Sequence, residues 1–495
     1  MALEYGTNDT IAAVATALSE SGIGIIRISG PDAGIVTEKV FRTKNGVPVR
    51  SWKANTIHYG QIIDPDSEEM LDEVLVSWMK APHSYTTEDT SEINTHGGIL
   101  VMQRVLDAVF RAGARPAEPG EFTKRAFLNG RIDLSEAEAV MDLIQAQSDF
   151  SRRTALSQMR GALSGKIRRM RDIILHETAF IESALDDPDN YSLEGYPDTL
   201  EIICRDLIYE LDDMLARSEQ GQILRDGIRT TIVGRPNVGK SSVLNMLAGR
   251  EKAIVTDIPG TTRDVVEADI ELHCSSNHEI KGAACGNKVL LRLTDTAGIR
   301  ETDDTVEKIG VDRARQEMES AQLILFVVDG SQHLLKEDSR IAGMIRQQRL
   351  RGAECLLAVN KKDLARGFSD EELNGLCDML SQDGMSRFDG RNIIYLSCLK
   401  EEGLSELSNR IGEMFHAGSL IHSEEPMVVG ERHKAELRNA RKSLELTLNS
   451  VQNRMSEDLY AIDLMDAYTA LGRIIGEAVD DDLVDKIFSE FCLGK

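Results

Sequence analysis

The segment GRPNVGKS, Gly234–Ser241, has the residue types and spacing that bind nucleotide phosphates. It follows the apolar run TTIVG and precedes the helical sequence VLNMLAG, which is the context that a phosphate-binding loop requires. Backbone N–H groups at the helix start can face phosphate oxygens, Lys240 can reach the outer phosphoryl groups, and the Ser241 hydroxyl can bind Mg²⁺. The alternative is a chance glycine-rich turn, which the flanking strand and helix disfavour.

Three later motifs predict that the bound base is guanine. DTAG, Asp295–Gly298, ends an apolar run, so its carboxylate can bind the water shell of Mg²⁺ and its glycine N–H can sense the γ-phosphate. NKKD, Asn360–Asp363, ends the run CLLAVN, and Asp363 can accept hydrogen bonds from the ring N–H and the exocyclic amine of guanine. Adenine offers neither arrangement, so ATP should be excluded. SCLK, Ser397–Lys400, fits a loop whose backbone donates to the guanine carbonyl.

A threonine between these motifs completes the predicted nucleotide site. Thr262, within DIPGTTRD, is the expected Mg²⁺ ligand beside Ser241. The residues predicted to bind the nucleotide are Asn237, Val238, Gly239, Lys240, Ser241, Ser242, Thr256, Asp257, Ile258, Pro259, Gly260, Thr261, Thr262, Asp295, Thr296, Ala297, Gly298, Asn360, Lys361, Lys362, Asp363, Ser397, Cys398 and Leu399.

The motifs do not by themselves identify the group that activates water. After D-x-x-G stands Ile299, which can donate nothing, where Ras-like proteins carry a glutamine. Glu307 is the candidate general base, Glu301, Asp303 and Asp304 are local rivals, and a solvated carboxylate at a helix start is the alternative.

The source of positive charge for the transition state is also not evident, because no arginine finger can be identified. The oxygen of Asn237 could hold a monovalent cation beside the β- and γ-phosphates, in the place that a guanidinium would fill. Simple capping of the loop is the alternative role for this asparagine.

Length and composition bound the fold and the partners. The 495 residues predict two to four domains at roughly 100–200 residues each. A net charge of -25 should make most of the surface repel phosphate backbones, so any nucleic-acid contact must be local. The chain starts without a basic and then apolar signal sequence, and no apolar run approaches ~20 residues. We therefore expect a cytoplasmic protein with no membrane contact.

Four segments of different character follow one another. Residues 1–131 contain short β-like runs broken by Gly and Pro and predict an α+β domain. Residues 132–226 are amphipathic helices, with Ser135 as an expected cap. Residues 227–418 alternate apolar runs with helices, as in a doubly wound parallel α/β domain, and residues 419–495 return to helix. We expect a multidomain protein whose α/β domain is inserted in one helical bundle.

The seven cysteines are scattered and never spaced C-x-x-C, which argues against a disulfide framework and for a reducing compartment. His273, Cys274, His278 and Cys285 lie in one segment, but their spacing fits no zinc pattern, and we expect a hairpin tip there. Cys492 is a near-terminal thiol with possible reactivity, although an inert cysteine is commoner.

The chain resembles the tRNA modification GTPase family (MnmE, also called TrmE) over nearly its whole length. The matching text includes GIGIIRISGP, THGG, RPAEPGEFTKRAFLNGRIDLSEAEAVMDLI, GRPNVGKSS, DIPGTTRD, DTAGIRE, NKKD and the terminal FCLGK. The resemblance implies a folate-binding N-terminal domain that forms a homodimer, a helical domain and an inserted GTPase domain. It also implies an FAD-dependent partner, MnmG, with which members add aminomethyl or carboxymethylaminomethyl groups to the wobble uridine of tRNA.

The same resemblance implies roles for individual residues. K⁺ would be held by Asn237, Thr256, Ile258 and Thr261, K⁺ would stimulate hydrolysis, and Glu307 would be the catalytic residue. A one-carbon folate such as 5-formyl-tetrahydrofolate would contact Arg27, Glu92, Arg131 and Lys495. The two arginines suit the carboxylates or carbonyls of a folate, and Glu92 suits donors on the pterin ring. Ordinary surface ion pairing is the alternative.

Two basic segments are candidate surfaces for tRNA. Seven basic residues and no acid lie between Arg152 and Arg171, on what reads as one continuous helix. A second cluster, between Arg432 and Lys442, is interleaved with acids. A solvated bundle face paired with neighbouring acids is the alternative. The competing function is a ribosome-assembly switch protein, which would share the nucleotide motifs but would not need the first 130 residues or FCLGK.

Overall fold

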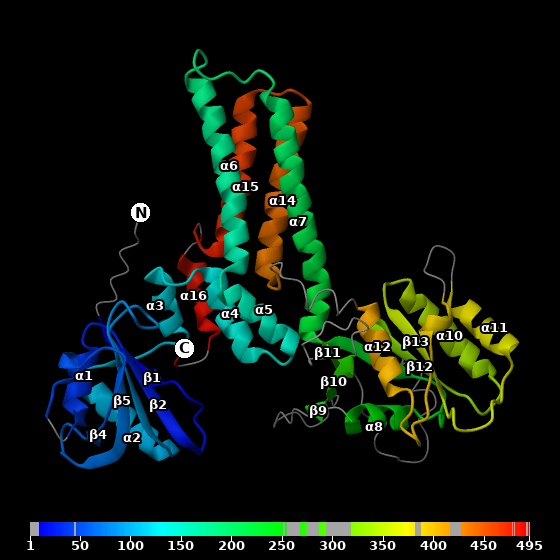
Figure 1. Ribbon diagram of the computed structural model, residues 1–495, viewed down its shortest axis with the longest axis horizontal. Coiled ribbons are helices and arrows are strands. Elements are labelled where there is room, and N and C mark those ends of the chain that lie inside the picture. The colour runs from blue at the N-terminus through cyan, green and yellow to red at the C-terminus, as the bar shows by residue number, and fades with distance from the viewer. Residues whose placement is uncertain are drawn as a thin grey trace, which may run out of the picture. The chain divides into compact units, whose positions relative to one another are not determined.

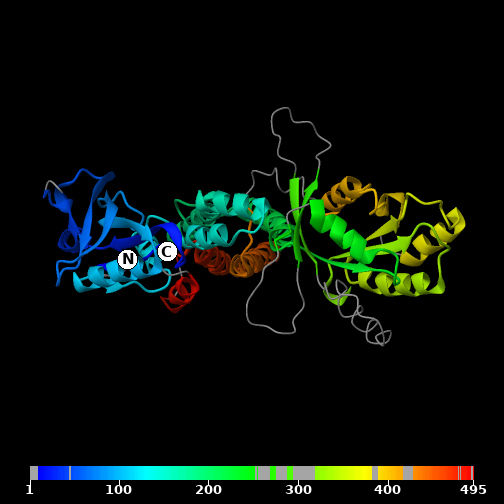
Figure 2. The same ribbon diagram turned by 90° about the horizontal axis from the view of Figure 1, so that it is seen from below.

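The computed structural model describes residues 9–43, 46–250, 253–254, 268–274, 287–293, 318–381, 388–415, 427–477, 479, 481–491 and 494. The chain divides into two compact units. The first contains the blue N-terminal and red C-terminal segments of Figures 1 and 2, and the second contains most of the green and yellow ones. Their bounds are Met1–Gln145, Leu156–Ile208 and Ala435–Lys495 for the first unit, and Ala146–Ala155 and Tyr209–Lys434 for the second.

The N-terminal part of the first unit is a sheet with, among the described residues, the strand order β3-β4-β5-β6-β2-β1-β7. Neighbouring strands are antiparallel except β1 and β7, which are parallel. This confirms the runs that the sequence predicted as strands. The strands are β1 (Ile11–Val14), β2 (Ser21–Ser29), β3 (Phe41–Arg42), β4 (Thr56–Ile63), β5 (Met70–Met79), β6 (Thr90–Gly97) and β7 (Arg115–Pro116).

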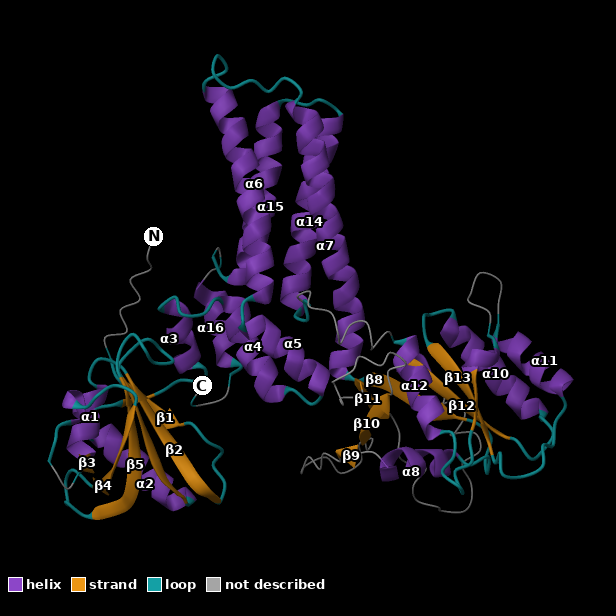
Figure 3. Cartoon of the chain, viewed as in Figure 1, coloured by secondary structure: helices purple, strands orange, loops and turns teal. Residues whose placement is uncertain are grey.

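One face of this sheet forms a hydrophobic core. Ile26, Val76 and Ile93 come from neighbouring strands and are fully buried. The helices α1 (Ala33–Val40) and α2 (Ile99–Arg111) cover that face, as Figure 3 shows, and their apolar residues belong to the same core. A short 3-10 helix, η1 (Val49–Ser51), packs beside α1.

The opposite face of the sheet carries the residues that alternate with the core, because successive side chains of a strand point to opposite faces. Two rows cross four strands there. In one row, Arg27 pairs in register with Glu92, which pairs with Ser77, which pairs with Ile57. The next row is formed by Ile25, Asn94, Leu75 and Tyr59. The sheet therefore displays a charged pair beside exposed apolar residues.

The helices that follow range from 8 to 31 residues in length. They are α3 (Glu121–Leu128), α4 (Leu134–Gln145), α5 (Asp149–Met159), α6 (Ala162–Asp186), α7 (Tyr196–Asp226), α14 (Glu431–Gln452), α15 (Glu457–Ile475) and α16 (Asp481–Ser489). Within the first unit, α6 packs along α15 (Figure 3). Arg171 of α6 forms an ion pair with Glu477, and its guanidinium lies 4.0 Å from the Tyr468 ring centroid. The predicted return of the chain to helix is confirmed.

Two expectations about these helices are wrong. The start of α4 is capped by Asp133, whose Oδ1 accepts from the Glu136 N–H at 3.0 Å, while the Glu136 carboxylate accepts from the Asp133 N–H at 3.0 Å. This reciprocal pair replaces the expected cap at Ser135, whose hydroxyl instead donates to Asp133. The basic segment is not one helix either, because Gly161 has a left-handed φ of 78° and separates α5 from α6.

The second unit is built on a sheet with, among the described residues, the order β14-β13-β12-β8-β11-β10-β9. The five strands from β14 to β11 are parallel, and β10 and β9 form an antiparallel edge. The predicted parallel sheet is thus confirmed. The strands are β8 (Ile228–Val233), β9 (Ala253–Ile254), β10 (Ala268–Cys274), β11 (Asn287–Leu293), β12 (Leu323–Asp329), β13 (Glu354–Asn360) and β14 (Ile393–Tyr395).

Helices cover this sheet and bury it on both faces. β12 is buried along its whole length, and its residues alternate between two separate hydrophobic clusters. A strand with six consecutive apolar residues, here 323–328, needs such a covering on each face. The covering elements are α8 (Lys240–Arg250), α10 (Lys336–Arg349), α11 (Asp370–Leu380), the 3-10 helix η3 (Gly390–Asn392) and α12 (Leu404–Met414).

Among the described residues, every helix is too short or too polar to cross a lipid bilayer.

Candidate functional site

The phosphate loop connects the end of β8 to the start of α8 and is tightly packed. Gly239 has a φ of 99°, and a Cβ on it would lie 2.2 Å from Asn360 Nδ2. Only glycine tolerates both constraints. Asn237 is also left-handed, with a φ of 63°. A buried ion pair holds the loop in place, because Arg235 Nε donates to the fully buried Asp338 at 2.8 Å.

Lys240 lies inside this loop. Its Nζ donates to the backbone oxygens of Gly234 and Arg235 at 3.0 and 2.9 Å. Burial lowers the pKa of this ammonium, and an anion bound beside it would stabilise its charged form. Ser241 and Ser242 follow in the first turn of α8, whose N-terminal N–H groups add partial positive charge. These residues fit the phosphates of a nucleotide.

Asn360 joins the phosphate loop to the predicted base-binding loops. Its Nδ2 donates to the Val238 carbonyl at 3.0 Å, and its Oδ1 accepts from the Cys398 N–H at 3.4 Å. Asn360 ends β13, and Cys398 follows β14, the neighbouring parallel strand. The structure therefore brings together three predicted segments that lie far apart in the sequence.

Asp363 is oriented by the third of these segments. The Ser397 hydroxyl donates to Asp363 Oδ1 at 2.6 Å, and this hydrogen bond holds the pKa of the carboxyl below its ordinary value. Ser397 Oγ also accepts from the Lys400 N–H at 3.2 Å. An ionised, oriented carboxylate is what recognition of two guanine N–H donors requires.

Asp329 belongs to the same site although no motif predicted it. Its Oδ2 lies 2.6 Å from Lys361 Nζ, and its Oδ1 accepts from the Ser331 N–H and hydroxyl at 2.9 and 2.6 Å. Burial raises the pKa of Asp329, but the hydrogen bonds from Lys361 and Ser331 outweigh it and keep the pKa below its usual range. No motif marks this residue, because its position in register with Asn360 on β13 is seen only in the structure.

Several predicted site residues lie outside the described part of the chain. Their roles stay predictions, as do the Mg²⁺ role of Ser241 and the K⁺ role of Asn237. The residues outside the described part are Thr256, Asp257, Ile258, Pro259, Gly260, Thr261, Thr262, Asp295, Thr296, Ala297, Gly298, Glu301, Asp303, Asp304, Glu307, Cys492 and Lys495.

The first unit brings three of the four predicted folate-binding positions to one place. Arg27 Nε forms an ion pair with Glu92 at 2.8 Å, and Arg27 Nη1 donates to the Gly494 carbonyl, next to Lys495, at 3.2 Å. Gly494 has a φ of 84°, and a Cβ there would lie 2.2 Å from the Val14 oxygen, so Gly494 lies directly against the end of β1.

Arg131 completes this group of residues. Its Nη1 donates to the Ser84 carbonyl at 2.6 Å, and its guanidinium lies 5.1 Å from the Tyr85 ring centroid. Arg27 lies 5.9 Å from the same centroid and 5.6 Å from that of Phe122. We call Arg27, Tyr85, Glu92, Arg131 and Gly494 the arginine pocket. Tyr85 and Phe122 were missed by the sequence analysis.

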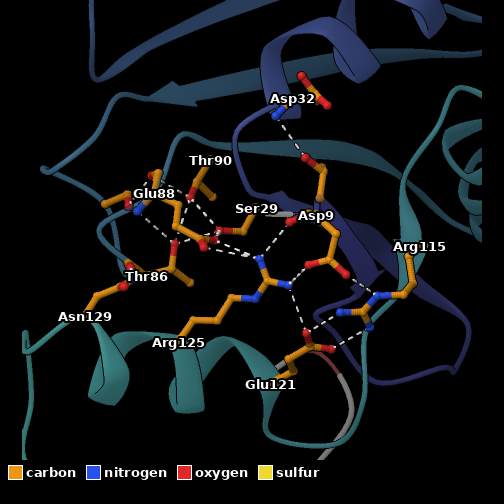
Figure 4. Close-up of polar contacts among 12 residues, drawn as sticks. Asp9, Ser29, Asp32, Thr86, Glu88, Thr90, Arg115, Glu121, Arg125 and Asn129 are labelled. Atoms are coloured by element: carbon orange, nitrogen blue, oxygen red, sulfur yellow. Dashed lines mark hydrogen bonds and ion pairs between the residues drawn. The ribbon is translucent and has the colours of Figure 1, made fainter. Parts of the chain in front are cut away.

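A buried network of charges supports the arginine pocket (Figure 4). Arg125 of α3 is almost fully buried and forms ion pairs with Asp9 at 2.7 Å, Glu88 at 3.2 Å and Glu121 at 2.9 Å. Arg115 lies beside it and pairs with Asp9 and Glu121, each at 2.6 Å. This network holds the segment before β1, the loop after β5 and the start of α3 together.

The structure does not test the metal alternative for residues 273–288. Within the described ranges, no group of three or more His, Cys, Asp or Glu residues is placed to hold a metal ion. Cys274 is buried, and its Sγ donates to the Ser408 carbonyl at 3.0 Å. His278 and Cys285 lie outside the described residues.

The parallel sheet, the phosphate loop after β8 and the base-binding loops after β13 and β14 define a P-loop GTPase domain, and the chain is a GTPase. Its other regions identify the family. The pattern described as the MnmE helical domain matches residues 134–492, and that described as the GTP-binding protein TrmE N-terminus matches residues 10–131. The chain belongs to the MnmE family of tRNA modification GTPases.

Individual relatives agree with this assignment. The tRNA modification GTPase MnmE of Lachnoclostridium phytofermentans is 45% identical over 488 residues, which cover 98% of this chain and 99% of that protein. The protein of the same name from Bacillus subtilis is 43% identical over 494 residues, covering 98% and 100%. Among solved structures, an Aquifex aeolicus Era variant bound to GDP and AlF4⁻ matches over 44% of this chain and 67% of its own, with 24% identity and a TM-score of 0.23.

Proposed function

We propose that the chain is a K⁺-stimulated GTP hydrolase that acts on tRNA in the cytoplasm. With an FAD-dependent MnmG partner and a folate one-carbon donor, it would add aminomethyl or carboxymethylaminomethyl groups at C5 of the wobble uridine. The observation that carries the nucleotide part is the position of Asn360, which bonds both the phosphate loop and the Ser397–Lys400 loop beside Asp363. The family relationship supports the tRNA part.

In this proposal Lys240 binds the phosphates, Ser241 and Thr262 bind Mg²⁺, and Asp363 selects guanine. Glu307 acts as general base, since Ile299 cannot orient water. Asn237, with Thr256, Ile258 and Thr261, holds K⁺, which supplies positive charge beside the transferred phosphoryl group. The left-handed backbone at Asn237 is by itself a reason for an asparagine, so the cation role needs a separate test.

The arginine pocket supports the folate proposal. A reduced folate has carboxylates at one end and a ring rich in N–H donors at the other. Because Arg27 and Glu92 are ion-paired, they would meet the same part of the ligand, where Glu92 would accept from N–H donors of the ring and Arg27 would donate to a carbonyl. Arg131 offers a second guanidinium for a carbonyl or carboxylate. The Gly494 carbonyl accepts from Arg27 in the same group of residues. We propose 5-formyl-tetrahydrofolate or a related one-carbon folate as the ligand.

The open face of the first sheet supports a homodimer formed through the N-terminal domain. Ile57, Tyr59 and Leu75 are neighbours there and are 64%, 56% and 46% exposed. An apolar cluster of this kind on a sheet face is typical of an interface.

The described contacts do not identify the surface that would bind tRNA. Arg152 and Arg153 pair with Asp149, Arg168 pairs with Asp133, and Arg171 is buried against α15. These contacts favour the alternative that this basic segment is a paired bundle face. In the second cluster, Lys434 pairs with Glu431 and Arg441 with Glu445.

Two experiments test the proposal. GTP turnover by the purified chain is measured with NaCl and then with KCl at equal ionic strength, and K⁺ should raise kcat at least ~10-fold. An equal turnover rate in NaCl and KCl would overturn the cation role. In a strain lacking the family member, mass spectrometry of tRNA nucleosides should show the wobble modification restored by this chain, with normal ribosomal subunits throughout. A subunit defect with normal wobble nucleosides would support the ribosome-assembly function instead.

A further inference from the structure

Tyr85 is the one side chain of the arginine pocket that contacts both arginines. Its ring centroid lies 5.9 Å from the Arg27 guanidinium carbon and 5.1 Å from that of Arg131. Both distances are within the ~6 Å over which a cation is attracted to an aromatic ring. The two arginines come from distant parts of the sequence, one from β2 and one from the segment after α3. Tyr85 therefore links them.

We propose that Tyr85 is a positioning residue whose ring sets the separation of Arg27 and Arg131 and thereby determines the affinity of the pocket for a reduced folate. This inference rests on the proposed folate site and names a residue that the family resemblance does not include. Tyr85 itself takes no part in the chemistry.

The first reason is electrostatic. The two guanidinium carbons lie 5.9 and 5.1 Å from one ring centroid, so their like charges repel across at most about 11 Å, and Glu92 offsets part of the charge of Arg27. The negative face of an aromatic ring attracts both and offsets part of this repulsion. A ligand then meets two cations that are already in place and does not have to organise them, which is the usual route to higher affinity.

The second reason is that Tyr85 is itself held firmly. Its hydroxyl is 3.0 Å from the Thr123 hydroxyl of α3, and its ring packs against the cluster that contains Phe122. The backbone on each side is fixed too, because the Ser84 carbonyl accepts from Arg131 and the Thr86 carbonyl accepts from Asn129 Nδ2 at 2.7 Å. A ring fixed at both ends can define where its partners lie.

The third reason comes from the network of Figure 4. Glu88, three residues after Tyr85, is paired with Arg125, and the Ser84 hydroxyl donates to the Glu88 carbonyl at 2.5 Å. The loop that carries Tyr85 is therefore linked through Glu88 to the buried Arg125. Such support is what a preorganised binding site needs.

The test is a titration of the full chain with 5-formyl-tetrahydrofolate by isothermal calorimetry. Tyr85→Leu removes the ring and should weaken binding about 10-fold, since two cation–π contacts are lost. Tyr85→Phe keeps the ring and its packing but loses the contact with Thr123, so it should bind within about 3-fold of the native chain and more tightly than Tyr85→Leu. Tyr191→Leu, at an exposed tyrosine of the same unit, is the matched control and should change nothing.

A double-mutant cycle separates positioning from general support of the fold. If Tyr85 acts through Arg131, Tyr85→Leu should cost less than about 2-fold in an Arg131→Gln background. An equal loss in both backgrounds would overturn the proposal. If Tyr85→Leu does not fold, as judged by its melting temperature, Tyr85→Met replaces it in the same cycle.

The outcomes for the two proposals differ. If the native chain does not bind the folate, the proposed folate site is wrong. If the native chain binds it and the ringless variant binds equally well, the folate site stands and the positioning role of Tyr85 is wrong.

Discussion

The Ser397 hydroxyl donates a 2.6 Å hydrogen bond to Asp363 Oδ1, and this contact joins the loops after β13 and β14. It leaves Asp363 ionised and fixed in direction. Both properties matter for base selection, because a carboxylate that rotates or takes up a proton can no longer accept from two donors of one ring edge.

Asp363→Asn should change the nucleotide that the chain hydrolyses. An amide can accept only one hydrogen bond from the guanine edge, and its NH₂ group faces the guanine amine, so affinity for GTP should fall about 100-fold. Xanthine carries a carbonyl in place of that amine, so XTP should bind the variant better than GTP. Competition binding with labelled GTP measures both changes, and unchanged preference for GTP would contradict the role of Asp363.

Ser397→Ala should shift the pH dependence of GTP binding. The hydroxyl lowers the pKa of Asp363, so its removal raises that pKa. Guanine needs the ionised form, and affinity is lost as the pH falls through the pKa. The variant should therefore lose affinity at a higher pH than the native chain does. Because the ordinary pKa of an aspartate is near 4 and the native value is lower, titrations from about pH 6 down to about pH 3 test this, and identical profiles would show that the contact does not tune the carboxyl.

Asp329→Asn should weaken GTP binding without slowing hydrolysis. The ion pair between Asp329 and Lys361 holds the turn that presents Asp363, so KM should rise about 10-fold while kcat stays the same. Asp389→Asn is the control, because Asp389 pairs with Arg391 on the surface of the same unit. A fall in kcat at constant KM would contradict a role in binding.

Asn237→Gly should abolish stimulation by K⁺ while leaving GDP affinity within about 3-fold of the native value. Glycine accepts the left-handed backbone of this position, whereas alanine would add strain of about 1–2 kcal/mol. The variant therefore removes the side-chain oxygen alone. If K⁺ still stimulates the variant fully, Asn237 does not hold the cation, and the left-handed backbone alone explains why an asparagine stands at this position.

Arg125→Met should destabilise the first unit by about 3–5 kcal/mol, because it removes the buried guanidinium that Asp9, Glu88 and Glu121 share and leaves Arg115 as the remaining ion-pair partner of Asp9 and Glu121. The two tryptophans, Trp52 and Trp78, both lie in this unit, so fluorescence during denaturation reports on it alone. Arg111→Gln removes an exposed ion pair to Asp64 and should cost less than about 1 kcal/mol. Equal effects of the two changes would contradict the importance of burial.

The same network predicts a sensitivity to acid. Hydrogen bonds from Arg115 and then Arg125 lower the pKa of Asp9. Burial raises the pKa of Glu121, but hydrogen bonds from Arg115, the Glu118 N–H and Arg125 outweigh it and the pKa is lowered. Groups with a lowered folded pKa stabilise the protein above their unfolded values, near 4, and lose this contribution as the pH falls through the folded values. The native unit should weaken below about pH 4, and Arg125→Met should show less of this dependence.

The strands and the nucleotide motifs could be predicted from the sequence because their signals are local. β12 is an unbroken apolar run, and the phosphate loop has its strand and helix on either side. The start of α4 was misplaced because Asp133 and Ser135 are both good caps, and only the structure shows which of them bonds the Glu136 N–H.

Asp329 and Arg125 could not be predicted because their roles depend on partners that folding brings near. A single aspartate after a strand is not a motif, and its importance comes from the register of β12 with β13. Arg125 stands in the family's longest matching stretch, yet its partner Asp9 is 116 residues away. The proposed role of Tyr85 likewise depends on its contacts with two arginines from other parts of the sequence.

The pairing of α6 with α15 has a consequence for synthesis on the ribosome. Arg171 and its partner Glu477 are separated by 306 residues, so at about 5–20 residues per second the first emerges on the order of 15–60 s before the second. During that interval the apolar side of α6, with Ile167, Ile174 and Ile181, lacks the helix that covers it in the finished protein. The nascent chain should therefore bind a chaperone, and release should coincide with translation of α15.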